Sequence, residues 1–190
     1  MTSYGNDQAD DAGTDIDVGT DILAGALAGA AAIWTLDRVD WFNYRHLDDE
    51  DSRRATERAR PGGMDPAHVA ANRLARGLGA EPPLPARQNA YGLAVHYGIG
   101  VAPAALYGAL RGRAPYVDAG RGAAFGLVLF LAQDEGLNTI LRLSGRPRDY
   151  PWQAHARGVI AHVAYGMTLD ALLRVLRPRR RRREPRRYAA

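Results

Sequence analysis

The chain of 190 residues contains no cysteine and no lysine. Without cysteine it has no disulfide framework, no thiol nucleophile and no zinc site built on thiolates. All 25 basic side chains are therefore arginine, a bias that we attribute first to a GC-rich genome. No P-loop or Rossmann fingerprint is present, because the GxG at Gly98 and Gly100 lies inside an apolar segment. The first 20 residues are acidic and polar, so no N-terminal signal peptide is expected.

Acidic and basic side chains gather at opposite ends of the chain. Residues 1–21 contain six Asp and no Arg, whereas "RPRRRRREPRR" at 177–187 contains eight Arg and one Glu. We predict an acidic disordered tail over 1–20 and an Arg-rich cytoplasmic tail over 177–190. The basic tail is expected to bind anionic lipid headgroups, with nucleic acid as the less favoured partner. The arginines assigned to this anionic-surface contact are Arg179, Arg180, Arg181, Arg182 and Arg183.

Between the tails lie four apolar segments separated by Pro, Gly and charged residues. The second, "AYGLAVHYGIGVAPAALYGAL" at 90–110, has no charged residue over 21 positions. That length is enough to cross a bilayer hydrocarbon core of about 30 Å. The sequence therefore predicts a membrane domain over 21–176, with four spans at about 22–42, 90–110, 120–143 and 157–176.

Small residues recur at helical spacing along these segments. Rows of small side chains let two helix backbones approach closely, which is how helices associate in lipid. The predicted fold is therefore all-α, an integral membrane four-helix bundle, although a soluble Ala-rich bundle is an alternative. The same glycines could also serve a homo-oligomer. The predicted packing positions are Gly25, Gly29, Gly92, Gly100, Gly122, Gly126, Gly158 and Gly166.

The long connection between the first and second spans predicts one short helix. In "MDPAHVAANRLARGLG", Asp65 can cap a helix and Pro66 suits its first turn. Val69, Ala70, Leu74 and Leu78 would share one face. This pattern indicates either an amphipathic helix on the membrane surface or a solvated connector helix.

The third span contains two adjacent acids, in "FGLVLFLAQDEGLNTILRL" at 125–143. An ionised carboxylate in the middle of a membrane helix costs about 2.5 to 3.5 kcal/mol, so it needs an interior partner. We predict an interior polar cluster of His96, Asp134, Glu135, Asn138 and His162. Neighbouring helix residues point about 100° apart, so we expect one acid to face the histidines and the other a different helix. Asp37 is expected to lie at the interface.

Three interpretations of this cluster stay open. It is a structural hydrogen-bond network, a proton or ion path, or a metal site. The metal ligands would be His96, Glu135, His155 and His162, although no HxxxH or HExxH pattern is present. No other cofactor is expected.

The last hundred residues resemble a known family. The stretches "HYGIGVAPAALYGAL", "GRGAAFGLVLF", "LSGRP", "YPW" and "AHVAYG" are similar to those of the YagU-like small bacterial inner-membrane proteins. The matching positions are His96, Tyr107, Gly122, Gly126, Pro151, Trp152 and His162. The chain departs from the family where "QAHARGVIA" lacks an acid between Trp152 and His162. The resemblance implies four helical spans and no assigned enzymatic chemistry.

Together these patterns predict a multi-pass protein of the bacterial inner membrane with both termini in the cytoplasm. Its function is expected to be non-enzymatic, in ion or proton balance or as a scaffold for a partner. One alternative is a soluble helical adaptor that binds nucleic acid or anionic surfaces through its Arg tail. A second is a membrane metal-binding protein.

Overall fold

The computed structural model describes residues 7–177, and over this range the chain is helical without any strand. The long helices are α1 (Asp7–His46), α4 (Ala90–Leu110) and α7 (Trp152–Leu176). Shorter ones are α2 (Glu50–Ala59), α3 (Pro66–Gly77), α5 (Ala123–Leu129) and α6 (Asn138–Ile140). A π-helix, η3 (Phe130–Leu137), joins α5 to α6, and three single 3₁₀ turns are η1 (Pro61–Gly63), η2 (Ala119–Gly122) and η4 (Pro147–Asp149).

Three of these helices are long and apolar enough to cross a membrane: Val18–His46 within α1, α4 and α7. The expected third span, 120–143, takes a different form. Residues 123–140 form one continuous rod, which we call the α5–α6 rod, but its middle is wound as a π-helix. The all-helical class is confirmed, and the described residues supply three candidate spans rather than four.

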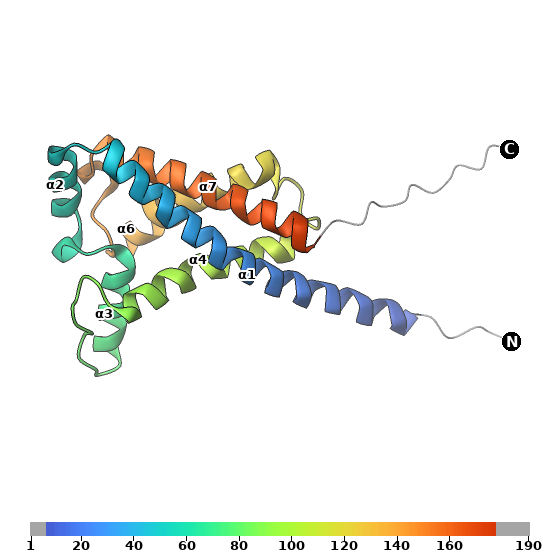
Figure 1. Ribbon diagram of the computed structural model, residues 1–190. Helices are drawn as coiled ribbons and strands as arrows, with labels where there is room; N and C mark the ends of the chain where they lie inside the picture. Colours follow the sequence, from blue (N-terminus) through green and yellow to red (C-terminus); the bar gives the residue numbers. More distant parts are fainter. Residues whose placement is uncertain (1–6, 178–190) are drawn as a thin grey trace, which may run out of the picture.

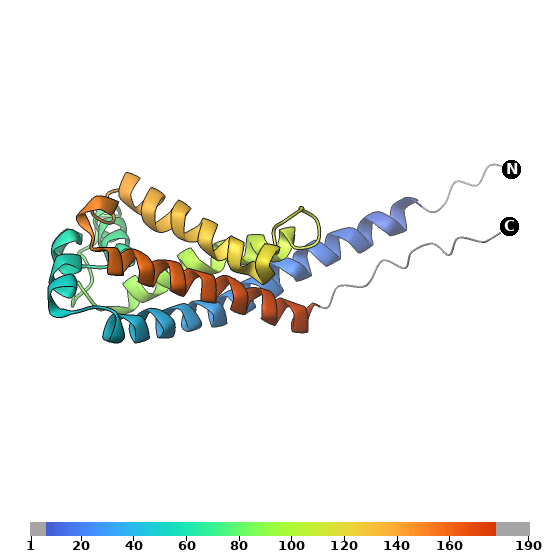
Figure 2. The ribbon, with the colours of Figure 1, turned by 90° about the horizontal axis from the view of Figure 1, so that it is seen from above.

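α1 and the α5–α6 rod run in one direction and α4 and α7 in the opposite one, with α7 between α1 and the rod (Figure 2). α1 also packs along α4. The start of α1 and the end of α7 lie at one end of the molecule, here called the terminal end (Figure 1). α2 and α3 lie at the opposite end, the loop end.

Glycines lie where the helices approach most closely. A Cβ atom added at Gly25 or Gly29 of α1 would collide with Ala104 of α4. In the same way, a Cβ at Gly122 or Gly126 would collide with backbone carbonyl groups of α7. These backbones are in direct contact, an arrangement that larger side chains would prevent.

Of the remaining predicted glycines, three meet side chains and Gly166 meets backbone. Gly92 faces the ring of His68, Gly100 faces Ile33 and Gly158 faces the ring of Phe130, while Gly166 opposes Gly122. Each glycine makes room for a neighbouring element.

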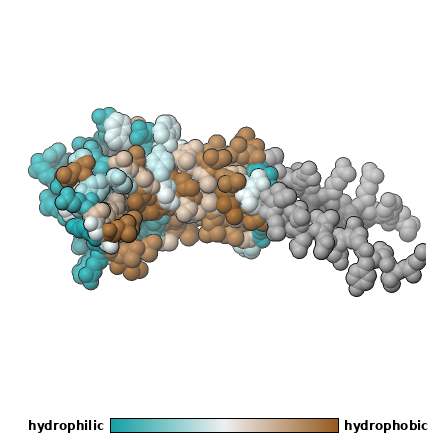
Figure 3. Space-filling model, turned by 90° about the horizontal axis from the view of Figure 1, so that it is seen from below, coloured by the Kyte–Doolittle hydropathy of each residue, from teal (hydrophilic) through white to brown (hydrophobic). Residues whose placement is uncertain are grey.

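Large apolar side chains cover the outside of the long helices. Figure 3 shows a hydrophobic band around the middle of the molecule and a more hydrophilic loop end. Among the exposed residues of this band are Leu23, Leu27, Leu106, Val128 and Leu131. A continuous apolar surface of this kind is unusual for a soluble monomer and is what a lipid-facing surface requires.

The short helix predicted in the long connection is α3, which lies crosswise to the long helices at the loop end (Figure 1). Asp65 caps it by accepting a hydrogen bond from the His68 N–H, and Pro66 begins it. However, only part of the expected apolar face is buried: Val69 is buried, whereas Leu74 and Leu78 are exposed. The buried face contacts α4.

α2 has its own capping residue. The backbone N–H of Ser52 donates to the Asp49 carboxylate, and this hydrogen bond lowers the pKa of Asp49. α1 begins at Asp7, so it includes much of the stretch that the composition predicts as a disordered tail over 1–20. The Arg-rich stretch from Arg179 to Arg183 lies outside the described residues.

Candidate functional site

A cavity of about 840 Å³ lies between α1, α4, α7 and the α5–α6 rod, toward the loop end. Ionisable side chains from several elements line it. They include four histidines, and each of these is paired with a carboxylate. The pairs are His68 with Asp65, His96 with Asp37, His155 with Glu135, and His162 with Asp134.

The two adjacent acids lie in the π-helix η3. Its backbone bonds reach one residue further than in an α-helix, so that the N–H of Asn138 donates to the carbonyl of Gln133. The wider turn reduces the angle between neighbouring side chains. Glu135 pairs with His155 and Asp134 with His162, so both acids meet histidines of α7.

Asp134, Asn138 and His162 form one part of the predicted cluster. The Nε2 atom of His162 lies 3.8 Å from Asp134 Oδ2, an ion-pair distance longer than a hydrogen bond. The Asn138 amide donates to the other carboxylate oxygen at 3.4 Å. The Nδ1 atom of His162 lies 2.9 Å from the carbonyl of Gly158, which makes Nδ1 the protonated ring nitrogen.

Glu135 forms a separate pair with His155. The two side chains meet at 2.7 Å through His155 Nδ1, and Nε2 of the same ring lies 3.0 Å from the carbonyl of Pro147. A carbonyl oxygen can only accept, so Nε2 carries a proton. Nδ1 therefore either donates a second proton to a carboxylate or accepts one from a protonated Glu135.

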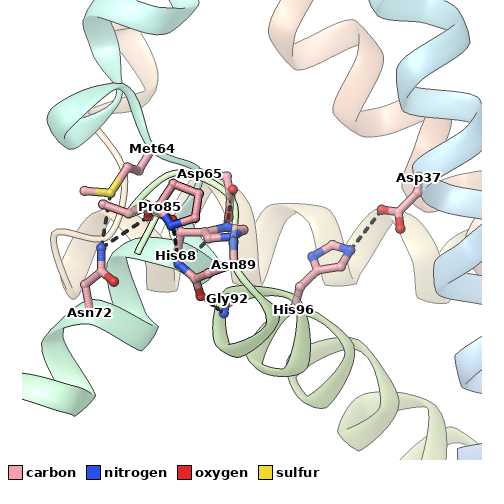
Figure 4. Close-up of polar contacts among 10 residues, drawn as sticks. Asp37, Met64, Asp65, His68, Asn72, Pro85, Asn89, Gly92 and His96 are labelled. Carbon is pink, nitrogen blue, oxygen red and sulfur yellow. Dashed lines mark hydrogen bonds and ion pairs between the residues drawn. The ribbon is translucent and has the colours of Figure 1, made fainter. Parts of the chain in front are cut away.

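His96 lies on the opposite wall, apart from the acids of η3. Its Nε2 atom is 2.9 Å from Asp37 Oδ1 of α1 (Figure 4). Asp37 is thus a cavity residue and not only an interfacial one. His96, Asp134, Glu135, Asn138 and His162, the residues of the predicted polar cluster, all line this one cavity, although His96 makes its hydrogen bond with Asp37 and not with the acids of η3.

The fourth pair is at the loop end. His68 meets Asp65 at 2.6 Å, and its other nitrogen accepts the N–H of Asn89 at 3.2 Å (Figure 4). These bonds fix the tautomer with the proton on Nδ1. His68 thereby ties the start of α3 to the start of α4.

The histidines do not assemble as metal ligands. Among the side chains that the structure describes, residues 18–177, no group of three His, Asp or Glu is placed to hold a metal ion. His96, Glu135, His155 and His162, the set expected for a metal, take part in three different pairs.

Arg157 is an interior residue that the sequence patterns did not single out. Its guanidinium is buried, pairs with Asp40 at 3.0 Å and with the buried Asp48, and stacks 5.0 Å from the ring centre of Tyr44. It joins α7 to the end of α1 at the edge of the cavity. The sequence did contain one signal for Arg157, an arginine in the first turns of an otherwise apolar helix.

A second missed cluster lies at the terminal end, around Asp170 of α7. The Asp170 carboxylate is fully buried and accepts hydrogen bonds from Tyr107 at 2.9 Å, Arg111 at 3.1 Å and Arg174 at 2.6 Å. Its position in the row of i+4 steps with His162 and Gly166 was visible in the sequence. The sequence did not show that Asp170 of α7 pairs with Arg111, the residue directly after α4.

No known protein family, curated protein or solved structure matches this chain.

Proposed function

We propose that this chain is a multi-pass membrane protein that takes up and releases protons in the cavity between its helices. The observation that carries the proposal is the lining: four histidines, each beside a carboxylate, share one cavity in a structure with three candidate membrane spans. Histidine is the side chain whose charge ordinarily changes near neutral pH. The role is non-enzymatic and contributes to proton or ion balance.

The proposed arrangement has four spans, with the α5–α6 rod as the fourth beside α1, α4 and α7. The exposed apolar band supports it, since lipid would cover that surface. The acids of the rod face α7 and not the outside, as carboxylates at membrane depth must. We assign the protein to the bacterial inner membrane and to the YagU-like family on the sequence resemblance.

Both termini are proposed to be cytoplasmic. The terminal end carries Arg113 and Arg177 at the ends of helices, and the basic tail follows directly after α7. Arginines beside a span favour the cytoplasmic side and contact anionic lipid headgroups.

Proton exchange draws on the geometry of two neighbouring pairs. His155 lies between the Glu135 carboxylate and the Pro147 carbonyl, and His162 presents Nε2 toward Asp134 at a distance that one water molecule can bridge. His96 and Asp37 face the same space from the other wall. Protons entering the cavity therefore meet several sites that can bind and release them.

The test is proton movement in vesicles that contain the purified protein and a trapped pH-sensitive dye. With a potassium gradient and valinomycin, the dye should report faster proton entry than in empty vesicles. The double variant Asp134→Asn, Glu135→Gln should reduce this rate toward that of empty vesicles, whereas Glu50→Gln on exposed α2 should not. Equal rates with and without protein would refute the proposal.

The membrane assignment has its own test. A protein lacking residues 178–190 is expected to stay with the membrane fraction after alkaline washing and to require detergent for extraction. If it remains soluble without detergent, the chain is a soluble helical protein and the adaptor alternative gains support.

A further inference from the structure

The cavity ends abruptly inside the bundle. On the loop side it reaches the connections around Gly63, Gln88 and Gly145. Toward the terminal end its last lining residues are Gly100 and Tyr165. The cavity therefore extends inward from the loop end and does not reach the terminal end.

Three aromatic rings stand at the closed end. The ring centre of Phe125 lies 4.7 Å from that of Tyr107 and 6.5 Å from that of Tyr165. Both tyrosine rings are almost fully buried. The three rings come from α4, α5 and α7, so they fill the region where these helices converge.

The two tyrosine hydroxyls point toward opposite sides of this layer. Tyr165 donates to the carbonyl of Gly100 at 2.7 Å, on the cavity side. Tyr107 donates to Asp170 at 2.9 Å, on the terminal side. Phe125 between them has no polar atom, so a proton relay through the hydroxyls is interrupted at its ring.

Ion pairs hold the terminal side together. Asp170 of α7 pairs with Arg111 and Arg174, and Asp21 of α1 pairs with Arg113 and Arg177 at 2.8 Å each. These contacts join α1, α4 and α7 just beyond the aromatic layer. At the loop end Arg157 of α7 pairs with Asp40 and Asp48, and Arg73 of α3 donates to the carbonyls of Leu141 and Arg142. The cavity lining nevertheless includes residues of the loop-end connections, which it does not do at the terminal end.

We propose that the cavity is entered from the loop side only, and that Tyr107, Phe125 and Tyr165 form the barrier that separates it from the terminal side. This inference rests on the membrane arrangement of the proposed function. If the cavity opens on one side only, the aromatic barrier, and Phe125 in particular, controls the passage of protons or water through the protein. The Asp170 cluster acts by holding the barrier helices together.

The absence of cysteine permits a direct test of sidedness, since any introduced thiol is the sole one in the chain. Gln133→Cys places a thiol in the cavity. Leu84→Cys at the loop end and Tyr116→Cys in the connection at the terminal end are exposed controls for the two sides. In right-side-out and inside-out membrane vesicles, a membrane-impermeant maleimide should label Gln133→Cys from the side that labels Leu84→Cys, and not from the other.

The barrier is tested in the same background. Adding Phe125→Ala to Gln133→Cys should permit labelling from both sides, because it removes the central ring. Adding Tyr107→Phe should keep labelling one-sided, because it retains the ring and loses only the hydroxyl. Labelling of Gln133→Cys itself from the terminal side, or from neither side, would overturn the inference, as would one-sided labelling with Phe125→Ala.

This assay reports access and not proton movement. One-sided labelling without proton entry in the dye experiment would therefore refute the proposed function and leave the barrier in place. Proton entry together with two-sided labelling would refute the barrier and leave the proposed function in place.

Discussion

The imidazole of His155 lies between two acceptors, with Glu135 Oε1 2.7 Å from Nδ1 and the Pro147 carbonyl 3.0 Å from Nε2. This geometry is suited to an imidazolium ring, which donates from both nitrogens. It links η3 to the first turn of α7. Among the four histidine pairs of the cavity, it is the one whose partners call for an additional proton.

The first prediction concerns the protonation of this ring. In protein labelled with ¹⁵N-histidine in detergent micelles at neutral pH, we expect the two His155 nitrogens to show the similar shifts of an imidazolium. Glu135→Gln should convert them to the separated shifts of a neutral ring, because the amide can donate to Nδ1. His155→Gln identifies the signals, and an unchanged spectrum in Glu135→Gln would contradict the interpretation.

The second prediction concerns the contact between α5 and α7. Gly126→Ala should lower the free energy of unfolding by about 1–3 kcal/mol, because the added methyl would overlap the backbone of His162. Gly98→Ala is the matched control, since no atom lies within 4 Å of a Cβ added there. Unfolding in mixed micelles of increasing denaturing detergent measures both. Equal stability of the two variants would show that the close approach at Gly126 is not formed.

The third prediction concerns Asp170. Asp170→Ala leaves the buried guanidinium of Arg111 without its carboxylate, a change that typically costs about 3–5 kcal/mol. Arg174→Gln removes a partner that is about half exposed, with 49 % of its side chain accessible, and should cost far less. The same unfolding assay compares them, and a smaller loss for Asp170→Ala than for Arg174→Gln would contradict the buried cluster.

The fourth prediction concerns the guanidinium shape of Arg157. Arg157→Lys keeps the charge but cannot reach Asp40 and Asp48 together while stacking on Tyr44. We expect it to melt at a clearly lower temperature than the parent protein, almost as low as Arg157→Gln. Arg54→Lys, at an exposed pair on α2, is the control and should be neutral. A lysine variant as stable as the parent would mean that charge alone is needed.

Much of the fold was readable from local patterns. The uncharged run 90–110 coincides with α4, and Asp65 and Pro66 mark the start of α3, because spacing and capping depend on residues close in the chain. The small residues Gly25 and Gly126 pointed to helix contacts for a similar reason: a missing side chain matters wherever the helix is placed. These patterns did not show which helix packs against each of these faces.

The site was only partly readable. Asp134 and Glu135 were expected to need interior partners, and the structure supplies His162 and His155. The pairing of both acids with α7 depends on how the α5–α6 rod packs against that helix, which no residue pattern in "LFLAQDEGLN" indicates. His96 and Asp37 were assigned to different places, because a contact between α1 and α4 depends on the crossing of two helices distant in sequence.

The sequence by itself determined the helical class, the apolar segments, the small-residue contact faces and the requirement that buried acids find partners. Each follows from the cost of exposing or burying a particular side chain, which is a property of the residue and its neighbours. The tertiary structure alone decided which histidine meets which carboxylate, that Arg157 and Asp170 tie opposite ends of α7, and that three aromatic rings close the cavity. These contacts join residues far apart in the chain, and their geometry depends on how the helices cross.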